Sequence, residues 1–263
     1  MFSSFEWMMA MRYLRARRQE GFISVIAWFS LLGIGLGVAT LIIVMSVMNG
    51  FRQELLGRIL GVNGHISVYG ASQSLTDFDA TANKVAKMAG VRKVTPIIEG
   101  QVMASAGGNA NGALVRGMRP ADARARPIIA DNIVAGSLQK FGGQDSVLIG
   151  TRLARNLGLQ VGSKITLISP KGNITAFGTV PRMRAYTVSA LFNVGMHEYD
   201  SSFIFMPLEA AQIYFKLPKA VNYLDVVLGN PDAAPAMART IWRVLDRKGK
   251  TVDWQRRNSS FFN

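Results

Sequence analysis

The chain has 263 residues, a formal net charge of +14 and no cysteine. The lack of cysteine excludes disulfide bonds, thiolate metal sites and a cysteine nucleophile. The charge alone would suit a nucleic acid, but the basic residues form no aromatic–basic cluster, so we expect no nucleic-acid partner and favour anionic lipid headgroups or an acidic partner surface.

The first twenty residues mix apolar and aromatic side chains with arginines at roughly helical spacing. This pattern predicts, for residues 1–20, a helix that lies in the cytoplasmic interface of a membrane. A frayed cytoplasmic tail is the alternative that the same residues allow.

The stretch from Gly21 to Phe51 contains no Asp, Glu, Lys or Arg. It is longer than the roughly 20 apolar residues that a helix needs to cross the hydrocarbon core of a bilayer. A signal peptide has an apolar stretch of only about 7–15 residues, and a buried core helix would carry a polar face. Residues 21–51 are therefore predicted to form a transmembrane helix.

The charges on either side of this stretch predict its orientation. Four arginines stand just before it, at positions 12, 15, 17 and 18. Beyond it the nearest charges are fewer and partly balanced, namely Arg52, Glu54 and Arg58. Positive charge favours the cytoplasmic side, so we expect a cytoplasmic N-terminus and a main domain outside the cytoplasm, which is the periplasm in a Gram-negative cell.

Two glycines of the predicted transmembrane helix, Gly33 and Gly37, lie four residues apart on one face. Small residues at this spacing let two membrane helices approach closely. We interpret them as a helix-packing face. The alternative is that glycine is simply common in membrane helices.

The residues after the helix predict an α+β domain. A strand, a helix closed by Gly90 and two further strands, between residues 65 and 118, form the first half of a split β-α-β arrangement. A strand, a helix and a short strand between residues 221 and 254 complete it. We therefore expect one porter-like α+β subdomain made of residues 52–120 and 208–263.

The intervening residues 121–207 are predicted to form a separate, β-rich subdomain with one short helix closed by Gly158. Within it, residues 170–184 place apolar side chains among glycines, prolines and polar residues. This composition predicts a protruding hairpin, and exposed apolar residues usually mark a partner site. A mobile loop without a role is the alternative.

No catalytic pattern is found. The only histidines, His65 and His197, lack the H-E-x-x-H spacing of a zinc site, and no G-x-S-x-G elbow occurs. We predict that both histidines are structural and that Glu198 and Asp200 are turn and surface groups. We expect no catalytic residue, no metal, no cofactor and no ATP hydrolysis by this chain.

Several blocks of the sequence resemble one known family, the lipoprotein-releasing ABC transporter permeases of the Lol system of Gram-negative bacteria. The most specific block is residues 12–51, which is similar to the family's first transmembrane segment, and SVMNGFRQEL and NGHISVYG continue the match. The block VLIGTRLARNLGLQVGSKITLISP (147–170) is shared more widely with permeases of the macrolide-exporter type. The ending VDWQRRNSSFF resembles the stretch that leads into the family's second transmembrane helix.

The resemblance implies an inner-membrane permease that takes lipoproteins from the membrane and passes them to a periplasmic carrier. It implies four kinds of partner: a second permease copy, identical or distinct, a cytoplasmic ATPase dimer, the periplasmic carrier, and the lipoprotein with its surrounding membrane lipid. It also implies the predicted division into a porter-like subdomain and an inserted β-rich one. ATP hydrolysis is expected in the separate ATPase subunit.

The resemblance also implies two sets of site residues. One permease type of the family binds the carrier with a hairpin, here called the hook hairpin (residues 170–184). Its candidate carrier-binding residues are Ile174, Phe177, Gly178, Val180, Pro181 and Arg182. Candidates for a cavity that holds acyl chains lie near the outer end of the transmembrane helix, where flexible thioethers adapt to irregular ligands, and are Met45, Val47 and Met48.

The family has three further membrane helices after the external domain, and this sequence stops at Asn263. The chain is therefore expected to be the N-terminal portion of such a permease. Two alternatives stay open: a macrolide-exporter-type or division-type permease of the same superfamily, and a complete single-pass adaptor anchored in the membrane.

Overall fold

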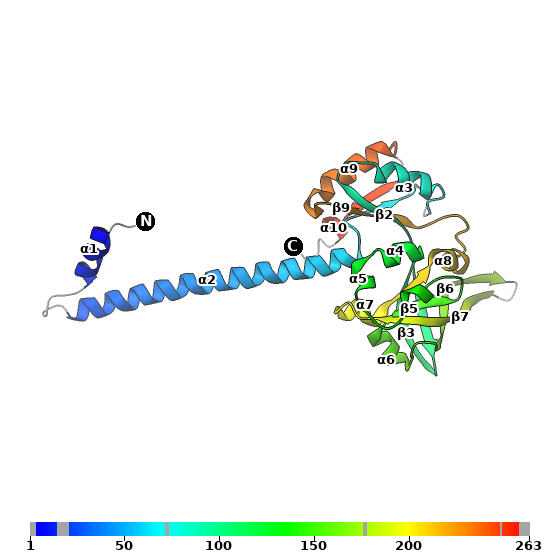
Figure 1. Cartoon of the computed structure of the whole chain (residues 1–263), viewed down its shortest axis with the longest axis horizontal. Helices are drawn as coiled ribbons and strands as arrows, with labels where there is room; N and C mark the ends of the chain where they lie inside the picture. The colour runs from blue at the N-terminus through cyan, green and yellow to red at the C-terminus, as the bar shows by residue number, and fades with distance from the viewer. Residues whose placement is uncertain (1–3, 15–20, 72–73, 176–177, 248, 258–263) are drawn as a thin grey trace. The chain divides into compact units, whose positions relative to one another are not determined.

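The computed structural model describes residues 4–14, 21–71, 74–175, 178–247 and 249–257. The chain divides into two units, Met1–Leu56 and Gly57–Asn263, which are described one at a time. Figure 1 labels the helices and strands.

The first unit is helical. It contains α1 (Ser4–Leu14), where an interfacial helix was predicted, and most of α2 (Gly21–Val62). Among the described residues, Val25–Gly50 is the one helical stretch long and apolar enough to cross a membrane, and none of it is buried. The helix extends beyond the predicted membrane-spanning range of residues 21–51, because α2 continues to Val62. The added residues keep apolar positions three or four apart and contain no proline, which suits a continuing helix.

The second unit begins with the split β-α-β arrangement. Four strands pair in the order β10-β1-β9-β2, all antiparallel, as in a β-α-β-β-α-β ferredoxin-like sheet. Helices α3 and α9 pack against these strands (Figure 1). The elements are β1 (Ile66–Tyr69), α3 (Phe78–Ala86), β2 (Val91–Ala106), β9 (Tyr223–Leu228), α9 (Ala234–Val244) and β10 (Lys250–Asp253).

Strand β2 belongs to two sets of strands. Its first part, Val91–Ile97, pairs with β9, and its second part, Ile98–Ala106, pairs with β3. From there the pairing runs β3-β8-β5-β7-β6 and returns to β2 through Met103–Ser105, so six strands form a closed circuit. The further strands are β3 (Asn109–Met118), β4 (Ile133–Gly136), β5 (Ser146–Gly150), β6 (Lys164–Thr175), β7 (Gly178–Phe192) and β8 (Phe203–Pro207).

The expectation of a single helix in residues 121–207 is wrong. Short helices also form around the strands, and three of them start with proline at the first helical position, a start signal because proline has no N–H to satisfy there. The shorter elements are α4 (Pro120–Arg124), α5 (Pro127–Ala130), η1 (Leu138–Lys140), α6 (Thr151–Leu157), α7 (His197–Ser202), α8 (Leu208–Phe215), η2 (Pro231–Ala233) and α10 (Trp254–Arg257).

The helix that was predicted to close at Gly158 is confirmed as α6. Gly158 follows its last residue with a left-handed backbone, φ +65°, which glycine adopts at little cost at a helix end. Leu153, Ala154 and Leu157 of α6 are buried and attach the helix to the rest of the domain.

One apolar core runs through both sets of strands. It contains Ile97 and Tyr223 of the four-stranded sheet together with Phe192 and Phe205 of the closed circuit, and Val62 at the end of α2. The last residue of α2 is therefore fully packed in the second unit, with 1% of its surface exposed. The polar groups next to Val62 must find partners inside the protein.

Candidate functional site

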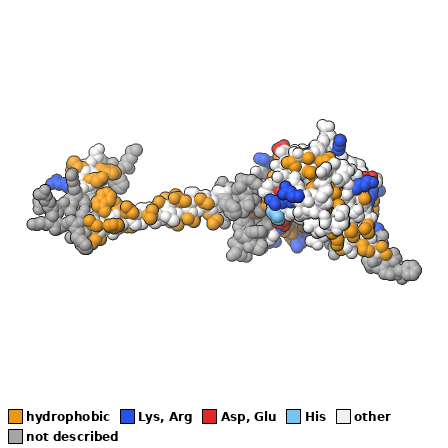
Figure 2. All heavy atoms as spheres, turned by 90° about the horizontal axis from the view of Figure 1, so that it is seen from below, with side chains coloured by type: hydrophobic (Ala, Val, Ile, Leu, Met, Phe, Trp, Pro, Cys, Tyr) orange, Lys and Arg blue, Asp and Glu red, His pale blue; other side chains and the backbone are white. Residues whose placement is uncertain are grey.

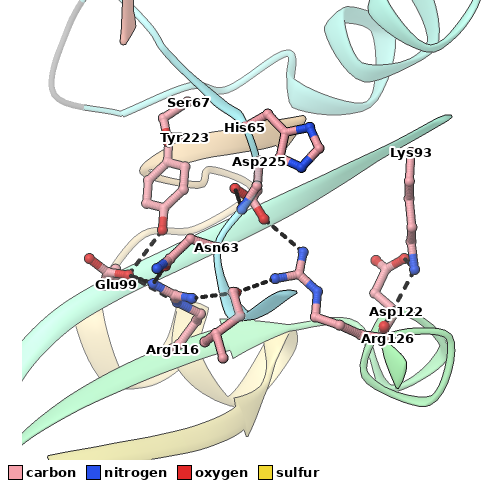
Figure 3. Close-up of polar contacts among 12 residues, drawn as sticks. Asn63, His65, Ser67, Lys93, Glu99, Arg116, Asp122, Arg126, Tyr223 and Asp225 are labelled. Carbon is pink, nitrogen blue, oxygen red and sulfur yellow. Dashed lines mark hydrogen bonds and ion pairs between the residues drawn. The ribbon is translucent and has the colours of Figure 1, made fainter. Parts of the chain in front are cut away.

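The end of α2 is bound by two arginines. Arg116 on β3 and Arg126, just before α5, both donate a hydrogen bond from Nη1 to the backbone oxygen of Val62, the former at 3.0 Å (Figure 3). The last carbonyls of a helix lack partners within the helix and carry partial negative charge, so a guanidinium stabilises them. We call these arginines and their partners the helix-end network.

Arg116 connects α2 with both sheets. Its guanidinium donates to Asn63 Oδ1 at 2.9 Å and to Glu99 Oε2 at 2.6 Å, and the Tyr223 hydroxyl donates to the same Glu99 oxygen at 2.9 Å. Burial raises the pKa of the Tyr223 hydroxyl well above its ordinary value although Arg116 opposes the shift, so Tyr223 stays protonated and remains a donor. Asn63 also donates to the Tyr199 hydroxyl at 2.6 Å.

Arg126 connects α2 with strand β9. Its Nη2 lies 2.7 Å from Asp225 Oδ2, and both side chains are at most 7% exposed. The other Asp225 oxygen accepts a hydrogen bond from the backbone N–H of Gly64 at 2.8 Å. Only glycine fits at this point, because a Cβ on Gly64 would lie 2.3 Å from that carboxylate oxygen.

The network is electrically balanced. Two guanidinium groups face the carboxylates of Glu99 and Asp225, and Lys93 forms a separate pair with Asp122 at 3.1 Å beside them. A buried pair of this kind stabilises little against an apolar alternative, but removing one partner costs several kcal/mol because the other charge stays buried. The arrangement can hold the end of α2 in one position. It offers no displaced proton or nucleophile for catalysis.

The predicted structural role of His65 is confirmed. Its ring is buried, and Nδ1 accepts a hydrogen bond from the backbone N–H of Leu228 at 3.0 Å. Burial lowers the pKa of His65, and nearby Asp225 opposes that shift. His197 is exposed at the start of α7. Among the described residues, no group of three or more His, Asp or Glu side chains could hold a metal ion.

The prediction that Asp200 is a surface group is wrong, whereas Glu198 is exposed. Asp200 is 1% exposed and accepts a hydrogen bond from the backbone N–H of Val194 at 2.9 Å. Burial raises the pKa of its carboxyl. Asp200 therefore holds the loop before α7, which is a structural task.

The hook hairpin is formed by the ends of β6 and β7. These strands pair to Thr175 and Gly178, beyond the last β6 residue that pairs with β2, Ile168. Near the root, Val180 and Met183 are 53% and 62% exposed. Figure 1 shows β6 and β7 side by side, and Figure 2 shows hydrophobic side chains spread over one face of the described residues. A groove of about 930 Å³ at the root is lined by Ile168, Pro170 and Pro181, among others.

The predicted hook residues fall into two groups in the structure. Val180 and Pro181 are exposed, whereas Arg182 is half-buried and donates a hydrogen bond to the backbone oxygen of Tyr214 at the end of α8. Ile174 and Gly178 belong to the paired strands; the side chain of Ile174 and the exposure of Gly178 are outside what the structure describes, as is Phe177 altogether.

The candidates on α2 lie on exposed parts of the helix. Met45, Val47 and Met48 are all more than half exposed. A Cβ on Gly33 or Gly37 would meet nothing within 4 Å, so both glycines are open to a neighbouring helix. The lipid-contact role of Met45, Val47 and Met48 and the helix-packing role of the two glycines stay predictions.

The helix-end network was not predicted from the sequence. A signal was present, because Arg116 and Asp225 each interrupt a run of strand-like apolar residues, ALVRGM and YLDVVL. A charge at such a position is rarely buried unless it is paired.

The chain is similar to known proteins along its whole length. A family model described as MacB-like periplasmic core domain matches residues 27–244. The lipoprotein-releasing system transmembrane protein LolC of Neisseria meningitidis serogroup B is 34% identical over 264 residues, covering 100% of this chain and 63% of that protein. LolC of Xylella fastidiosa is 31% identical with the same coverage. LolE of Haemophilus influenzae is 25% identical, covering 85% of this chain and 55% of that protein.

The chain thus spans less than two thirds of the length of these curated relatives. Two solved structures are also similar at 13% identity. One is the periplasmic region of MacB from Actinobacillus actinomycetemcomitans, with a TM-score of 0.49, covering 80% of this chain and 98% of that one. The other is the extracellular domain of the transporter YknZ from Gram-positive bacteria, with a TM-score of 0.48, covering 73% and 99%.

Proposed function

Because the chain belongs to the MacB-like periplasmic core domain family, we propose that it is the N-terminal part of an ABC transporter permease that extracts lipoproteins from the inner membrane and passes them to a periplasmic carrier. The observation that carries the proposal is the 34% identity with a lipoprotein-releasing transmembrane protein over the whole chain. That identity includes the apolar helix as well as the folded unit. ATP hydrolysis belongs to a separate cytoplasmic subunit.

In this proposal α2 crosses the inner membrane with the N-terminus in the cytoplasm. The supporting observations are the apolar stretch Val25–Gly50, none of which is buried, and the four arginines that precede it. The second unit then lies in the periplasm. Its split β-α-β sheet belongs to the porter-like subdomain, and the inserted, β-rich subdomain of residues 121–207 supplies β5, β6, β7 and β8 of the closed circuit.

The transporter is completed by a second permease copy and an ATPase dimer. Gly33 and Gly37 are the residues on which α2 packs against another membrane helix, since a bare glycine face lets the two backbones approach. Met45, Val47 and Met48 face the acyl chains of the lipoprotein.

The hook hairpin binds the carrier. Two features support this assignment: its paired strands continue beyond the sheet, and apolar side chains at its root are exposed. Exposed apolar groups on a protruding hairpin gain free energy when a partner covers them. Arg182 takes part by holding the hairpin to α8 through the Tyr214 backbone oxygen.

The test is a pulldown of the purified periplasmic lipoprotein carrier by the chain in detergent. Replacing residues 173–181 by a Gly-Ser linker of equal length should abolish binding, because it removes the apolar contacts and leaves the sheet intact. The control replaces another hairpin tip, the β2–β3 turn at 106–109, by the same kind of linker, and should bind as the unchanged chain does.

Undiminished pulldown by the hook variant would remove the hook from the proposal. Absence of binding by the unchanged chain would contradict the carrier-recruiting role itself.

A further inference from the structure

A second cavity lies directly beside the helix-end network. Its volume is about 460 Å³, and its walls come from Asn63 after α2, from β1, β9 and β10 of the four-stranded sheet, and from α7 and β8. All of these residues belong to the second unit. None of the roles described above uses this cavity.

The cavity has an excess of positive charge. Its lining includes Arg116, Lys250 and Arg257 but one carboxylate, Glu99, which is already paired with Arg116 at 2.6 Å. Within the described part of the chain, no ion pair is formed by Lys250 or Arg257. Two exposed cations therefore face the cavity without a carboxylate partner there.

The two cations lie beside strand β1. Lys250 stands opposite Tyr69 in the β10–β1 register, and Arg257 donates a hydrogen bond to Ser67 Oγ on the same strand. Ser67 and Tyr69 are two residues apart, so their side chains leave the same face of the sheet. Lys250 and Arg257 therefore lie on the same face of β1.

The remaining walls are aromatic. The rings of Tyr69 and Tyr223 are 5.2 Å apart, and those of Tyr199 and Phe203 are 4.5 Å apart. The Arg116 guanidinium lies 5.1 Å from the Phe203 ring centre. Such walls can cover the apolar or glycerol part of a ligand, while tyrosine hydroxyls add donors.

We propose that this cavity binds a phosphate group carried by an amphiphile, as in an anionic phospholipid. Arginine offers a planar set of donors that fits phosphate oxygens, and lysine supplies a point charge. A purely inorganic ligand would leave the aromatic walls without a partner. The choice of a lipid rests on the membrane location in the proposed function, because phospholipid is the phosphate-bearing amphiphile that surrounds such a chain.

Calorimetric titration of the purified chain in neutral detergent tests the proposal. The probes are a short-chain phosphatidylglycerol, the matching zwitterionic phosphatidylcholine, and inorganic phosphate. The variant is the double substitution Lys250→Gln and Arg257→Gln. The matched control is Arg256→Gln, which removes the neighbouring, largely exposed cation that does not line the cavity.

The unchanged chain and the Arg256→Gln control should bind phosphatidylglycerol equally, and phosphatidylcholine more weakly. The double variant should bind phosphatidylglycerol at least about tenfold more weakly, because it loses two charge-assisted contacts. If phosphatidylglycerol binds and inorganic phosphate does not, the phosphate group that the cavity recognises belongs to a lipid headgroup. Equal binding of inorganic phosphate would instead identify free phosphate and overturn the lipid assignment.

Absence of phosphatidylglycerol binding, or equal affinity in the double variant, would overturn the proposal. The measurement needs neither carrier nor ATPase. Its failure is therefore distinguishable from a failure of the hook pulldown, which reports on the proposed function.

Discussion

Gly64, two residues after the end of α2, lies against the side chain of Asp225 on the four-stranded sheet. Its N–H donates to Asp225, and the same carboxylate occupies the space that a Cβ would need. Asp225 is itself held by Arg126 at 2.7 Å. A side chain at residue 64 must therefore displace a buried ion pair.

We predict that Gly64→Ala lowers the free energy of unfolding by about 1–3 kcal/mol, the usual cost of inserting a group into a packed interior. The control is Gly112→Ala on β3, where a Cβ would meet nothing within 4 Å. That substitution should be neutral or slightly stabilising. Urea unfolding of both variants measures the difference, and equal stability of the two would contradict the close contact.

His65 gives the folded unit a pH dependence. Burial lowers the pKa of its imidazole below the ordinary value of 6.5. Below pH 6.5 the imidazole of His65 takes up a proton more readily in the unfolded chain than in the folded chain. The stability that His65 contributes is therefore fully present above pH 6.5 and is lost as the pH falls toward the folded pKa.

We predict that urea unfolding shows a loss of stability as the pH falls below about 6.5, and that His65→Gln makes this loss smaller. Glutamine keeps an acceptor for the Leu228 N–H and cannot take up a proton. His197→Gln, at an exposed position, is the matched control and should behave as the unchanged chain does. An unaltered pH dependence in His65→Gln would refute the assignment.

The partners in the helix-end network could not be predicted from the sequence. Charges within strand-like runs do indicate that Arg116 and Asp225 are buried and paired. Their partners, however, are far away along the chain: Arg116 meets residue 62, and Asp225 meets residues 64 and 126. Only the folded sheet brings these segments together.

At the scale of elements, periodic segments were predictable and short ones were not. The helix α6 has three apolar residues on one face and a glycine at its end, and this sequence pattern was sufficient to predict the helix. The helices α4 and α5 have five and four residues, too few for an apolar period to appear. The hook hairpin was predicted from its composition. The pairing of its two strands, which starts at Thr175↔Gly178, could be determined only from the structure.

The exposed methionines of α2 allow a test of the proposed lipid contact. A photocrosslinking residue at Met45, Val47 or Met48 in the whole transporter should form adducts with a lipoprotein, because these side chains face its acyl chains in the proposal. The same residue placed at Val25, at the other end of the apolar stretch, is the control and should give none. Absence of a lipoprotein adduct at all three positions would contradict the assignment.

At the scale of the whole molecule, the order of strands and helices predicted an α+β domain after one apolar helix, and both are observed. Hydrophobic periodicity was sufficient for this, since the strand, helix and strand β1, α3 and β2 are matched by β9, α9 and β10 after residue 221. The closed circuit of six strands was not predictable, because its closure depends on a pairing between β6 and β2 that no local pattern encodes.

In the proposed function, α2 crosses the inner membrane and carries the second unit into the periplasm. The direct measurement fuses two reporters in turn to Asn263 of the chain in Gram-negative cells: alkaline phosphatase, active only in the periplasm, and a fluorescent protein that matures only in the cytoplasm. The account predicts an active phosphatase and a dark fluorescent protein, both in the membrane fraction. A bright fluorescent protein with an inactive phosphatase, or recovery of the chain in the soluble fraction, would contradict it.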